Sequence, residues 1–453
     1  MKHSRLSPVA WMLAIVLTLL PACAAPSPRT ARESSASLPV KLRLGVSLTA
    51  PELRDFEAAV KELDAAHPEW EIALEQVPQE GNIEKLTANL AAGTLPDVQY
   101  VFNNQVRRFI ARGAFLDLKP LIAKYDFALD DFFPNLFTQF RFTKDGIEGL
   151  YGIPTLAAPE IVFYNKAMFD AAGVPYPTDE WTFEDMRAAA RKLTLDKNGR
   201  NADDPAFDKT QVVQWGWYGA LPSGLYSRNF ITPFDADWCA DADCMTMDFT
   251  SPAVVSAIRW WAEMSIKEGT ALADTFRGTQ TGIGGDPFIA GKAAMSLNGW
   301  FAIGQLNSQG NIDYDVVQPF KGPGGKRASG VSASGYAIAA TTQHPDEAFK
   351  LIMALSDPAF MTRAWAKPGH GVPARRSIAR EAINLAHPPA NQAAAIAAME
   401  YGEPFAPYTS GGFEAYLKTI DDFIAILKGD KPLEQTLAEI ERTTNDILQK
   451  AGP

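Results

Sequence analysis

The sequence predicts an α/β protein in which strands and helices alternate. Segments with strand-like alternation and segments with helical periodicity follow one another from residue 41 to residue 102. Helical patterns then dominate the C-terminal third of the chain. Apolar residues make up 47% of the chain and charged residues 21%, which is the balance of a chain that buries a full core. A length of 453 residues allows two or three domains of about 100 to 200 residues each.

The alternation is clearest at the start of the expected fold. Residues 41–48 alternate as a strand, and Thr49 and Glu52 then have the spacing of a capping box, which predicts the start of a helix. The apolar face of this helix consists of Leu53, Phe56, Val60 and Leu63. The pattern repeats with a strand over 70–77, a helix over 83–92 and a strand over 97–102.

Later helix starts are marked by capping residues and by proline in the first turn. They lie at Thr182, Ser251, Pro345 and Asp357. Two further segments, 416–427 and 433–448, have apolar residues at helical spacing and are expected to end the fold.

The first 22 residues have the plan of a signal peptide. Lys2 and Arg5 precede an apolar run over 9–20, with no acidic residue among them. At about 12 residues, this run is shorter than the roughly 20 that a membrane-spanning helix needs. The sequence therefore predicts export rather than a membrane span.

The end of this leader resembles a bacterial lipobox. The tetrad Leu20-Pro21-Ala22-Cys23 predicts lipid modification of Cys23, and cleavage beside Cys23 to release an unanchored protein is the alternative. Residues 23–39 would then hold the lipid anchor and an Ala/Ser/Pro-rich flexible tether. We expect folding to begin near Val40.

The other two cysteines, Cys239 and Cys244, flank a short polar loop. Export places them in an oxidising compartment, which favours a local disulfide between them. A zinc site is disfavoured because neither a His nor a second Cys pair lies nearby in the sequence.

The charge balance limits the class of partner. The chain has 42 Lys and Arg against 53 Asp and Glu, for a formal charge of −11, which disfavours a nucleic-acid-binding protein. The sequence has no P-loop motif, no nucleophile elbow and no zinc-protease helix motif. We therefore expect a small neutral ligand, with no cofactor and no metal.

Five segments, in chain order, resemble those of a known family. They are HPEWEIALEQVP at 67–78; AAGTLPDV at 91–98; YGIP at 151–154 with FYNKAMF at 163–169 and AAG at 171–173; FIAGKAAM at 288–295 with NGW at 298–300; and SGYAI at 334–338 with GVPAR at 371–375. In this order and behind a lipobox, they are similar to segments of the extracellular solute-binding proteins of ABC importers, in the branch that includes maltose-binding protein. The resemblance covers nearly the whole chain after the leader.

The resemblance implies a type II periplasmic-binding-protein (Venus-flytrap) fold of two discontinuous α/β lobes that close on a ligand by hinge motion. Lobe one is expected to hold 40–154 and about 290–355. Lobe two is expected to hold about 159–289 and 356–450. The hinge crossovers are expected near 155–159, 316–320 and 355–358.

Polar residues just after expected strands are candidate ligand contacts, because ligands sit outside the carboxyl ends of strands in open α/β sheets. Ser47 and Thr49 follow the first strand, and Asn103 and Asn104 follow the third. Thr49 has an alternative role as a helix cap. Glu160, at the first expected crossover, is placed to accept sugar hydroxyls, to bind a cation or to hold a structural partner.

Three further candidates lie in the C-terminal half of the chain. Ser334 and Tyr336 lie in a glycine-rich segment where the backbone approaches a ligand easily. Arg375 is the weakest candidate.

Aromatic residues point to a sugar, because the C–H face of a sugar stacks on an aromatic ring. Trp300 is assigned by resemblance to the family position that packs on sugar. Trp215, Trp217 and Tyr218 cluster before a loop, so at least one of them is expected near the cleft. Trp260 and Trp261 lie inside an expected helix and are assigned to the core.

The resemblance implies a lipid-anchored, monomeric binding protein, in the periplasm or at the cell surface, that captures a neutral oligosaccharide and delivers it to ABC permease subunits. It is not expected to be an enzyme. A binder of glycerol phosphate compounds, which needs Lys or Arg in the cleft, is one alternative. An exported glycosidase that uses two carboxylates is the other.

Overall fold

The computed structural model describes residues 38–77, 81–144, 146–219, 228–241, 244–273, 286–382, 388–404, 409 and 411–452. Residues 39–453 form one compact unit, which is separate from residues 1–38. The expected signal peptide, Cys23 and nearly all of the tether lie outside the described residues. Within those residues, none of the helices combines the length and the apolar character needed to cross a membrane.

One large mixed sheet organises the unit. Among the described residues, its strand order is β2-β1-β3-β11-β6-β9-β8-β7, and β10 and β12 also pair with β6. The strands of this sheet are β1 (Val40–Val46), β2 (Trp70–Gln76), β3 (Val98–Phe102), β6 (Ile153–Asn165), β7 (Leu195–Asp196), β8 (Val212–Gly219), β9 (Ala293–Gly299), β10 (Tyr314–Val317), β11 (Val331–Ile338) and β12 (Val372–Pro373). A separate hairpin consists of β4 (Arg141–Lys144) and β5 (Ile147–Leu150).

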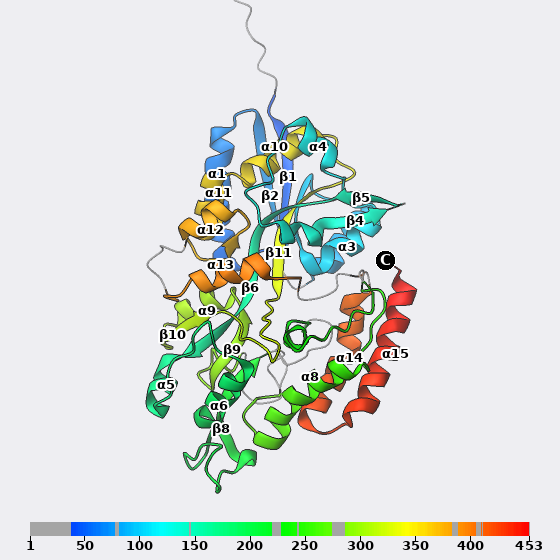
Figure 1. The fold of residues 1–453 in the computed structure, drawn as a ribbon. Coiled ribbons are helices and arrows are strands. Elements are labelled where there is room, and N and C mark those ends of the chain that lie inside the picture. Colours follow the sequence, from blue (N-terminus) through cyan, green and yellow to red (C-terminus); the bar gives the residue numbers. More distant parts are fainter. Residues whose placement is uncertain are drawn as a thin grey trace, which may run out of the picture. The chain divides into compact units, whose positions relative to one another are not determined.

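Strand β6 belongs to both halves of this sheet (Figure 1). Its residues 153–159 pair with β11, and its residues 160–164 pair with β9. We call β2, β1, β3, β11, β12 and the first part of β6 the first half, and β9, β8, β7, β10 and the second part of β6 the second half. The change of partner falls beside Pro159, whose ring nitrogen has no hydrogen to donate to a neighbouring strand.

Helices cover both halves of the sheet. Those with contacts in the first half are α1 (Ala50–Ala66), α2 (Asn82–Ala92), α3 (Asn103–Ala111), α4 (Lys119–Lys124), α10 (Pro345–Leu355), α11 (Pro358–Met361), the π-turn η6 (Thr362–Ala366), α12 (Arg376–Ala382) and α13 (Ala393–Tyr401). Those with contacts in the second half are α5 (Lys166–Ala172), α6 (Phe183–Leu193), α7 (Arg228–Ile231), α8 (Pro252–Glu263), the π-turn η5 (Met264–Glu268), α9 (Ala302–Gln309), α14 (Gly412–Lys428) and α15 (Leu433–Ala451).

The local signals in the sequence produce the expected helix starts. The Glu52 carboxylate accepts hydrogen bonds from the backbone N–H and the hydroxyl of Thr49, at 2.8 and 2.7 Å, so the expected capping box opens α1. Thr182 and Asp185 form a second capping box at the start of α6. Cys239 and Cys244 form the disulfide that the sequence predicts.

Several segments in the C-terminal half of the chain pair or pack in a different half of the sheet from the lobe in which they were expected. Strand β9, expected in lobe one, pairs with β8 and with the second part of β6. Helix α10 contacts β1 and β3, and η6 contacts α1, so residues just after 356 pack in the first half rather than in lobe two. The expected hinge at 355–358 lies between α10 and α11, within the first half. Sequence order alone does not reveal these non-local pairings.

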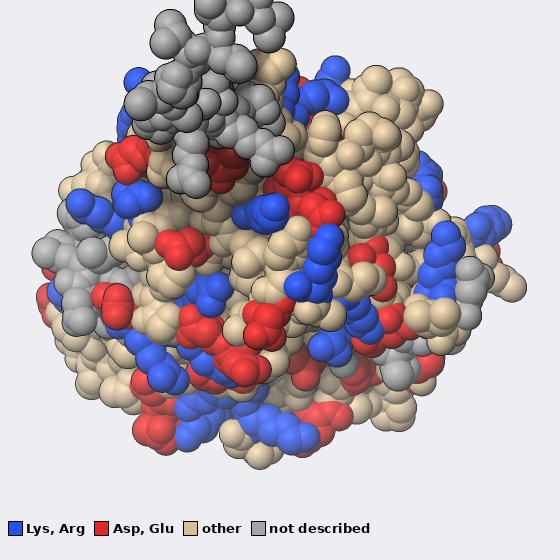
Figure 2. All heavy atoms as spheres, turned by 90° about the horizontal axis from the view of Figure 1, so that it is seen from above, with Lys and Arg blue, Asp and Glu red and all other residues tan. Residues whose placement is uncertain are grey.

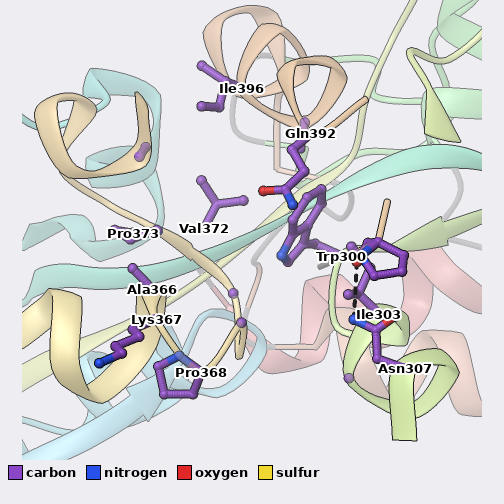
Figure 3. A pocket seen from close by; sticks show the side chains of 16 residues that line it. Trp300, Ile303, Asn307, Ala366, Lys367, Pro368, Val372, Pro373, Gln392 and Ile396 are labelled. Atoms are coloured by element: carbon purple, nitrogen blue, oxygen red, sulfur yellow. Dashed lines mark hydrogen bonds between the residues drawn. The ribbon is translucent and has the colours of Figure 1, made fainter. Parts of the chain in front are cut away.

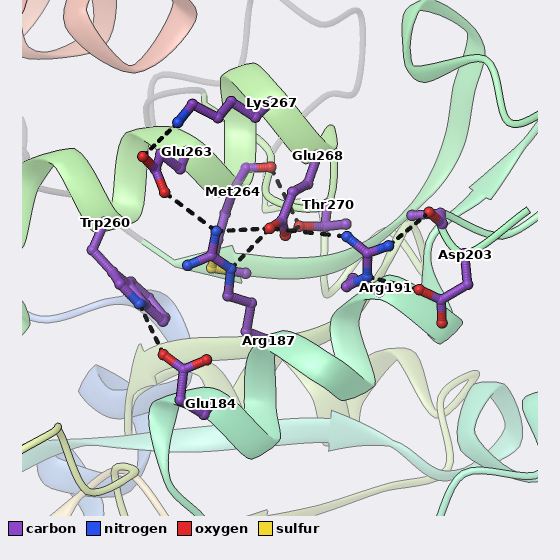
Figure 4. A network of polar contacts seen from close by, with 11 residues as sticks. Glu184, Arg187, Arg191, Asp203, Trp260, Glu263, Met264, Lys267, Glu268 and Thr270 are labelled. Carbon is purple, nitrogen blue, oxygen red and sulfur yellow. Dashed lines mark hydrogen bonds and ion pairs between the residues drawn. The ribbon is translucent and has the colours of Figure 1, made fainter. Parts of the chain in front are cut away.

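A closed polar network holds α6 to α8 and η5 in the second half (Figure 4). The Arg187 side chain donates to Glu268 at 2.9 and 2.7 Å and lies 3.5 Å from Glu263. Its guanidinium also lies 5.1 Å from the ring centroid of Trp260. The side chain of Arg187 is only 18% exposed, so this network joins three segments in a partly buried environment.

Candidate ligand-binding cleft

A cavity of 1290 Å³ opens at the carboxyl ends of β1, β3 and β9, beside the middle of β6. Both halves of the sheet contribute to its wall. The first half contributes mainly α1, the ends of β3 and β11, residues 156–158 and the segment after η6, and the second half contributes Phe301 and α9. This is the position at which open α/β sheets bind ligands.

Aromatic rings line the cleft from both sides. Phe301, which follows β9, is 56% exposed and belongs to the cavity wall. Phe102, at the end of β3, is partly exposed on the opposite side, and Tyr100 is buried beside it with ring centroids 5.3 Å apart. The two partly exposed phenylalanines give the cleft flat apolar surfaces.

Hydroxyl groups also line the cleft. Ser332 and Ser334 of β11 line the cavity, as does Thr49 of the capping box. Burial raises the pKa of the Tyr100 phenol, and its hydrogen bond to Ser334 acts in the opposite direction. Tyr336 is fully buried in the core under this wall, and burial also raises its pKa. Ser334 and Thr49 are thus expected site residues that reach the cleft, whereas Tyr336 lies in the core.

Most charged groups of the cleft wall are already paired. His370 Nε2 lies 2.8 Å from an Asp55 carboxylate oxygen, and Arg363 Nε lies 3.2 Å from a Glu62 carboxylate oxygen. Lys367 is exposed and lines the cavity, and among the described residues no ion-pair partner lies within 4.0 Å of its ammonium group. Lys367 is therefore the basic group of this wall that is most available to a ligand.

A second, smaller pocket of 210 Å³ adjoins the cleft (Figure 3). It lies between α9, α13 and the segment from Ala366 to Pro373, and its lining includes Trp300, Ile303 and Ile396. The cleft and this side pocket share four lining residues: Gly304, Lys367, Pro368 and Gly369. Trp300 therefore lines the side pocket, and its neighbour Phe301 lines the cleft.

The family model for bacterial extracellular solute-binding proteins matches residues 50–364. The chain belongs to this family. A lipoprotein from the oleD 5′ region of Streptomyces antibioticus, described as uncharacterized, is 26% identical over 364 residues, which cover 78% of this chain and 73% of that protein. A Brucella abortus protein, described as a candidate binding protein, is 23% identical over 303 residues, which cover 66% of this chain and 67% of that protein.

Solved structures show that the solute-binding protein has the two-lobed fold of this family. An ABC substrate-binding protein of Listeria monocytogenes, solved with cycloalternan, superposes with a TM-score of 0.73 at 22% identity, covering 91% of this chain and 99% of that one. The sugar-binding protein MalE of Xanthomonas citri superposes with a TM-score of 0.72 at 19% identity, covering 91% of this chain and 98% of that one. We refer below to the two halves of the sheet as the first and second lobes.

Three chain segments of the solute-binding protein meet where β6 changes partner. The Glu160 N–H donates to the Gly330 carbonyl at 2.8 Å, and the Ser329 hydroxyl donates to the Glu160 carbonyl at 2.8 Å. The Val331 N–H donates to the Glu403 carbonyl at 2.7 Å, and the Glu403 N–H donates to the Ser329 carbonyl at 3.0 Å. Among the described residues, the three segments that meet here are the middle of β6, residues 329–331 and Glu403.

The side chain of Glu160 has an unusual environment at this junction. It is only partly exposed and accepts a hydrogen bond from the Asn229 amide of the second lobe. Loss of hydration raises the pKa of its carboxyl group to about 8, while hydrogen bonds act in the opposite direction. Glu160 is not part of the cleft wall, so its structural role at the junction is the one that these contacts support.

The remaining expected aromatics do not reach the cleft or the side pocket. Trp217 and Tyr218 are each 2% exposed, and Trp217 stacks on Trp261 in the core of the second lobe with ring centroids 5.9 Å apart. Trp215 is partly buried against the main core. Alternation along β8 and its pairing with β9 direct these rings into the protein.

Three other candidates have different positions. Ser47 is fully buried at the end of β1. Arg375 is held in the first lobe, where its Nε donates to the Ser356 carbonyl at 2.7 Å and its guanidinium lies 4.3 Å from the ring centroid of Phe132. Asn103 and Asn104 begin α3 next to Phe102, and their side chains lie outside the described residues.

Phe301 is a cleft residue that the sequence analysis missed, as are Phe102, Ser332 and Lys367. The segment that ends β9 contains two adjacent aromatic residues, and we assigned the sugar position to the first of them, Trp300. Trp300 is 7% exposed, whereas Phe301 is 56% exposed. Adjacent residues after a strand point in different directions, so the pair itself was the available signal.

Proposed function

We propose that the protein is the extracytoplasmic solute-binding component of an ABC importer and that it captures a neutral oligosaccharide between its lobes. The observation that carries this proposal is a cleft whose wall combines exposed aromatic rings, hydroxyl groups and contributions from both lobes. A ligand that touches Phe301 and the first-lobe wall together gains those contacts only when the lobes are close. Binding therefore favours the closed form over the open form.

The chemistry of the wall favours a sugar. Phe301 and Phe102 offer rings for the C–H face of a pyranose, Ser332 and Ser334 offer hydroxyls, and the Thr49 hydroxyl, which donates to Glu52, can still accept a hydrogen bond. Structural relatives with this fold were solved with maltotriose and with mannotriose. A neutral oligosaccharide fits a cavity of this size and polarity.

The arrangement of charge supports a neutral ligand over an anionic one. Arg363 lies in an ion pair with Glu62, and Asp55 and Glu52 also line the cavity. On the face drawn in Figure 2, the visible basic and acidic side chains are interspersed rather than gathered by sign. A glycerol phosphate ligand would have Lys367 as its main available cation and would face several carboxylates.

The proposed role is binding rather than catalysis. Of the cleft carboxylates, Glu52 is engaged in the α1 capping box and Asp55 is bonded to His370. These contacts leave no pair of carboxylates in this wall poised as a glycosidase acid and nucleophile. We propose that the permease subunits of the importer receive the ligand and that a lipid on Cys23 keeps the protein at the membrane.

A thermal-shift screen of residues 39–453 tests the proposal. The panel contains maltodextrins, mannobiose, mannotriose, cellobiose, glycerol 3-phosphate, spermidine and amino acids. A ligand at about 1,000 times its dissociation constant adds about 4 kcal/mol to the free energy of unfolding, which raises Tm by several degrees. We expect a shift with one set of neutral sugars, each recovered intact. A shift with glycerol 3-phosphate alone, or consumption of the sugar, would replace the proposal by one of its alternatives.

A further inference from the structure

The side pocket beside the cleft differs from it in chemistry. Its lining is mostly apolar and includes Trp300 and Ile303 on the α9 side and Ile396 of α13 (Figure 3). The Asn307 side chain is already occupied, because its Nδ2 donates to the Pro388 carbonyl at 3.1 Å and its Oδ1 accepts from the Tyr314 hydroxyl at 2.7 Å. A sugar ring placed here would find few free partners for its hydroxyls.

The volume of the side pocket indicates part of a ligand rather than a whole one. Pockets that hold an entire drug-sized molecule have volumes of about 300–1,000 Å³. The side pocket measures 210 Å³ and adjoins the 1290 Å³ cleft, with which it shares four lining residues. A group bound here therefore extends from a molecule that is held in the cleft.

Gly304 supplies an independent observation at the junction of the two cavities. It lies inside α9, where glycine weakens a helix relative to alanine. A Cβ added at Gly304 meets no atom within 4 Å, so close packing does not require glycine there. Gly304 lines both cavities, and the space above its Cα is open.

We propose that the ligand of this protein is a glycoside whose apolar aglycone, an aryl or alkyl group, passes Gly304 and occupies the side pocket. The sugar lies in the cleft against Phe301, and the aglycone lies between Trp300, Ile303 and Ile396. This inference rests on the proposed sugar-binding function and narrows the ligand to glycosides that carry an apolar aglycone. Two adjacent aromatic residues then contact different parts of the ligand: Phe301 contacts the sugar, and Trp300 contacts the aglycone.

The first experiment compares the methyl and phenyl glycosides of maltose, mannobiose and cellobiose by isothermal titration calorimetry. Burial of a phenyl ring in an apolar pocket increases affinity by roughly 10-fold or more. We expect the phenyl glycoside of the sugar that binds to have at least that advantage over the methyl glycoside. Equal affinities for the two glycosides would overturn the inference and leave the sugar-binding proposal intact.

Substitutions at Gly304 distinguish obstruction of the aglycone from a general loss of structure. Gly304→Leu fills the open space at this position, and Gly304→Ala is its matched control with the same gain in helix propensity. We expect the ratio of phenyl to methyl glycoside affinities to fall to about one in Gly304→Leu and to persist in Gly304→Ala. Ile396→Thr should lower the same ratio, whereas Ile122→Thr, a half-buried isoleucine of α4 away from both cavities, should not. A ratio that is unchanged in Gly304→Leu would also overturn the inference.

A direct probe keeps the two proposals distinguishable if no glycoside in the panel binds. In protein with labelled isoleucine methyl groups, phenol at millimolar concentration should shift the NMR signals of Ile303 and Ile396 and leave that of Ile161, buried elsewhere, in place. With no glycoside bound, such shifts would support the side pocket while the proposed function fails. No shift at Ile303 or Ile396 would overturn the side-pocket inference whatever the sugar data show.

Discussion

The Arg187 network and the cleft wall both contain charged and aromatic side chains. In the network these side chains are paired and partly buried, whereas in the cleft wall some of them are exposed. In the network, the guanidinium of Arg187 is shared between Glu263 and Glu268 and stacks on Trp260, and it is only 18% exposed. In the cleft wall, Phe301 is 56% exposed and Lys367 has no ion-pair partner among the described residues. Charged and aromatic side chains thus make structural contacts in the Arg187 network and remain available to a ligand in the cleft wall.

This difference predicts that substitutions in the two regions have separable effects. Removing one member of a partly buried ion network leaves its partners desolvated and unpaired, which lowers the free energy of unfolding. Removing an exposed ring leaves the folded state almost unchanged, because it had few contacts to lose. Stability and affinity therefore report on the two regions independently.

The largest expected effect is on stability, for Arg187→Met. The change leaves the carboxylates of Glu263 and Glu268 without their shared cation, and we expect a loss of about 3 kcal/mol in the free energy of unfolding. Urea denaturation monitored by tryptophan fluorescence measures this loss. Arg191→Met is the comparison: that side chain is 38% exposed, bonds Asp203 and lies only at the edge of the network, 4.0 Å from Glu268, so a loss of about 0.5 kcal/mol is expected. Equal losses in the two variants would show that the Arg187 network has no special stability.

The next effect is on affinity, for Phe301→Ala. Loss of the exposed ring should weaken binding of the sugar identified in the thermal screen by about 30-fold, or about 2 kcal/mol, with less than about 0.5 kcal/mol change in the free energy of unfolding. Titration calorimetry and urea denaturation measure the two quantities. Tyr176→Ala removes a ring that is 37% exposed outside both cavities, and it should leave affinity unchanged. Unchanged affinity in Phe301→Ala would remove this ring from the site.

The carboxyl group of Glu160 is desolvated, as the groups of the Arg187 network are, but its side-chain partner is a neutral amide rather than an opposite charge. Burial raises its pKa to about 8, so the folded state holds a proton that the unfolded state releases near pH 4.5. The unfolded state thus binds fewer protons between these values, and the contribution of Glu160 to stability falls as the pH rises from about 4.5 to about 8. Above about pH 8 that contribution is constant.

Glu160→Gln should remove this dependence on pH. The variant keeps an acceptor for Asn229 and cannot ionise, so at pH 8.5 it should be more stable than the unsubstituted protein by at least about 1 kcal/mol. At pH 5 the two should unfold at nearly the same urea concentration. Parallel stability curves from pH 5 to pH 8.5 would show that Glu160 does not titrate in this range.

Local sequence signals predicted the helix starts, and non-local pairing decided the rest of the fold. The capping boxes at Thr49 and Thr182 depend on residues three positions apart, so they can be read directly from the sequence. The partners of β9 lie more than 70 residues away in sequence, at 160–164 and 215–219, and nothing in its own residues specifies them. The helix α3 was not predicted, because Asn103 and Asn104 at its start were considered only as candidate ligand contacts after the strand.

The candidate site was predictable as a neighbourhood but not residue by residue. The rule that ligands sit at the carboxyl ends of strands identified Thr49, and the family resemblance identified the end of β9. It could not decide between Trp300 and Phe301, because that choice depends on how the chain leaves the strand. Nor could it show that Trp217 faces Trp261 in the core, since the packing of α8 on β8 is not visible in the sequence of either element.

The smallest expected effect is at Lys367, and it sharpens the comparison because this cation lacks the pairing that Arg187 has. For a neutral sugar, Lys367→Met should change affinity by less than about 2-fold, since an exposed ammonium contributes little to a neutral partner. For an anionic ligand such as glycerol 3-phosphate, the same variant should lose roughly 10-fold in affinity, because a charge-assisted contact disappears. Calorimetry with both ligands, in low salt and in 0.5 M salt, distinguishes the cases. A large loss for the neutral sugar would place Lys367 in direct contact with its hydroxyls, whereas salt-sensitive binding of the phosphate would favour the anionic alternative.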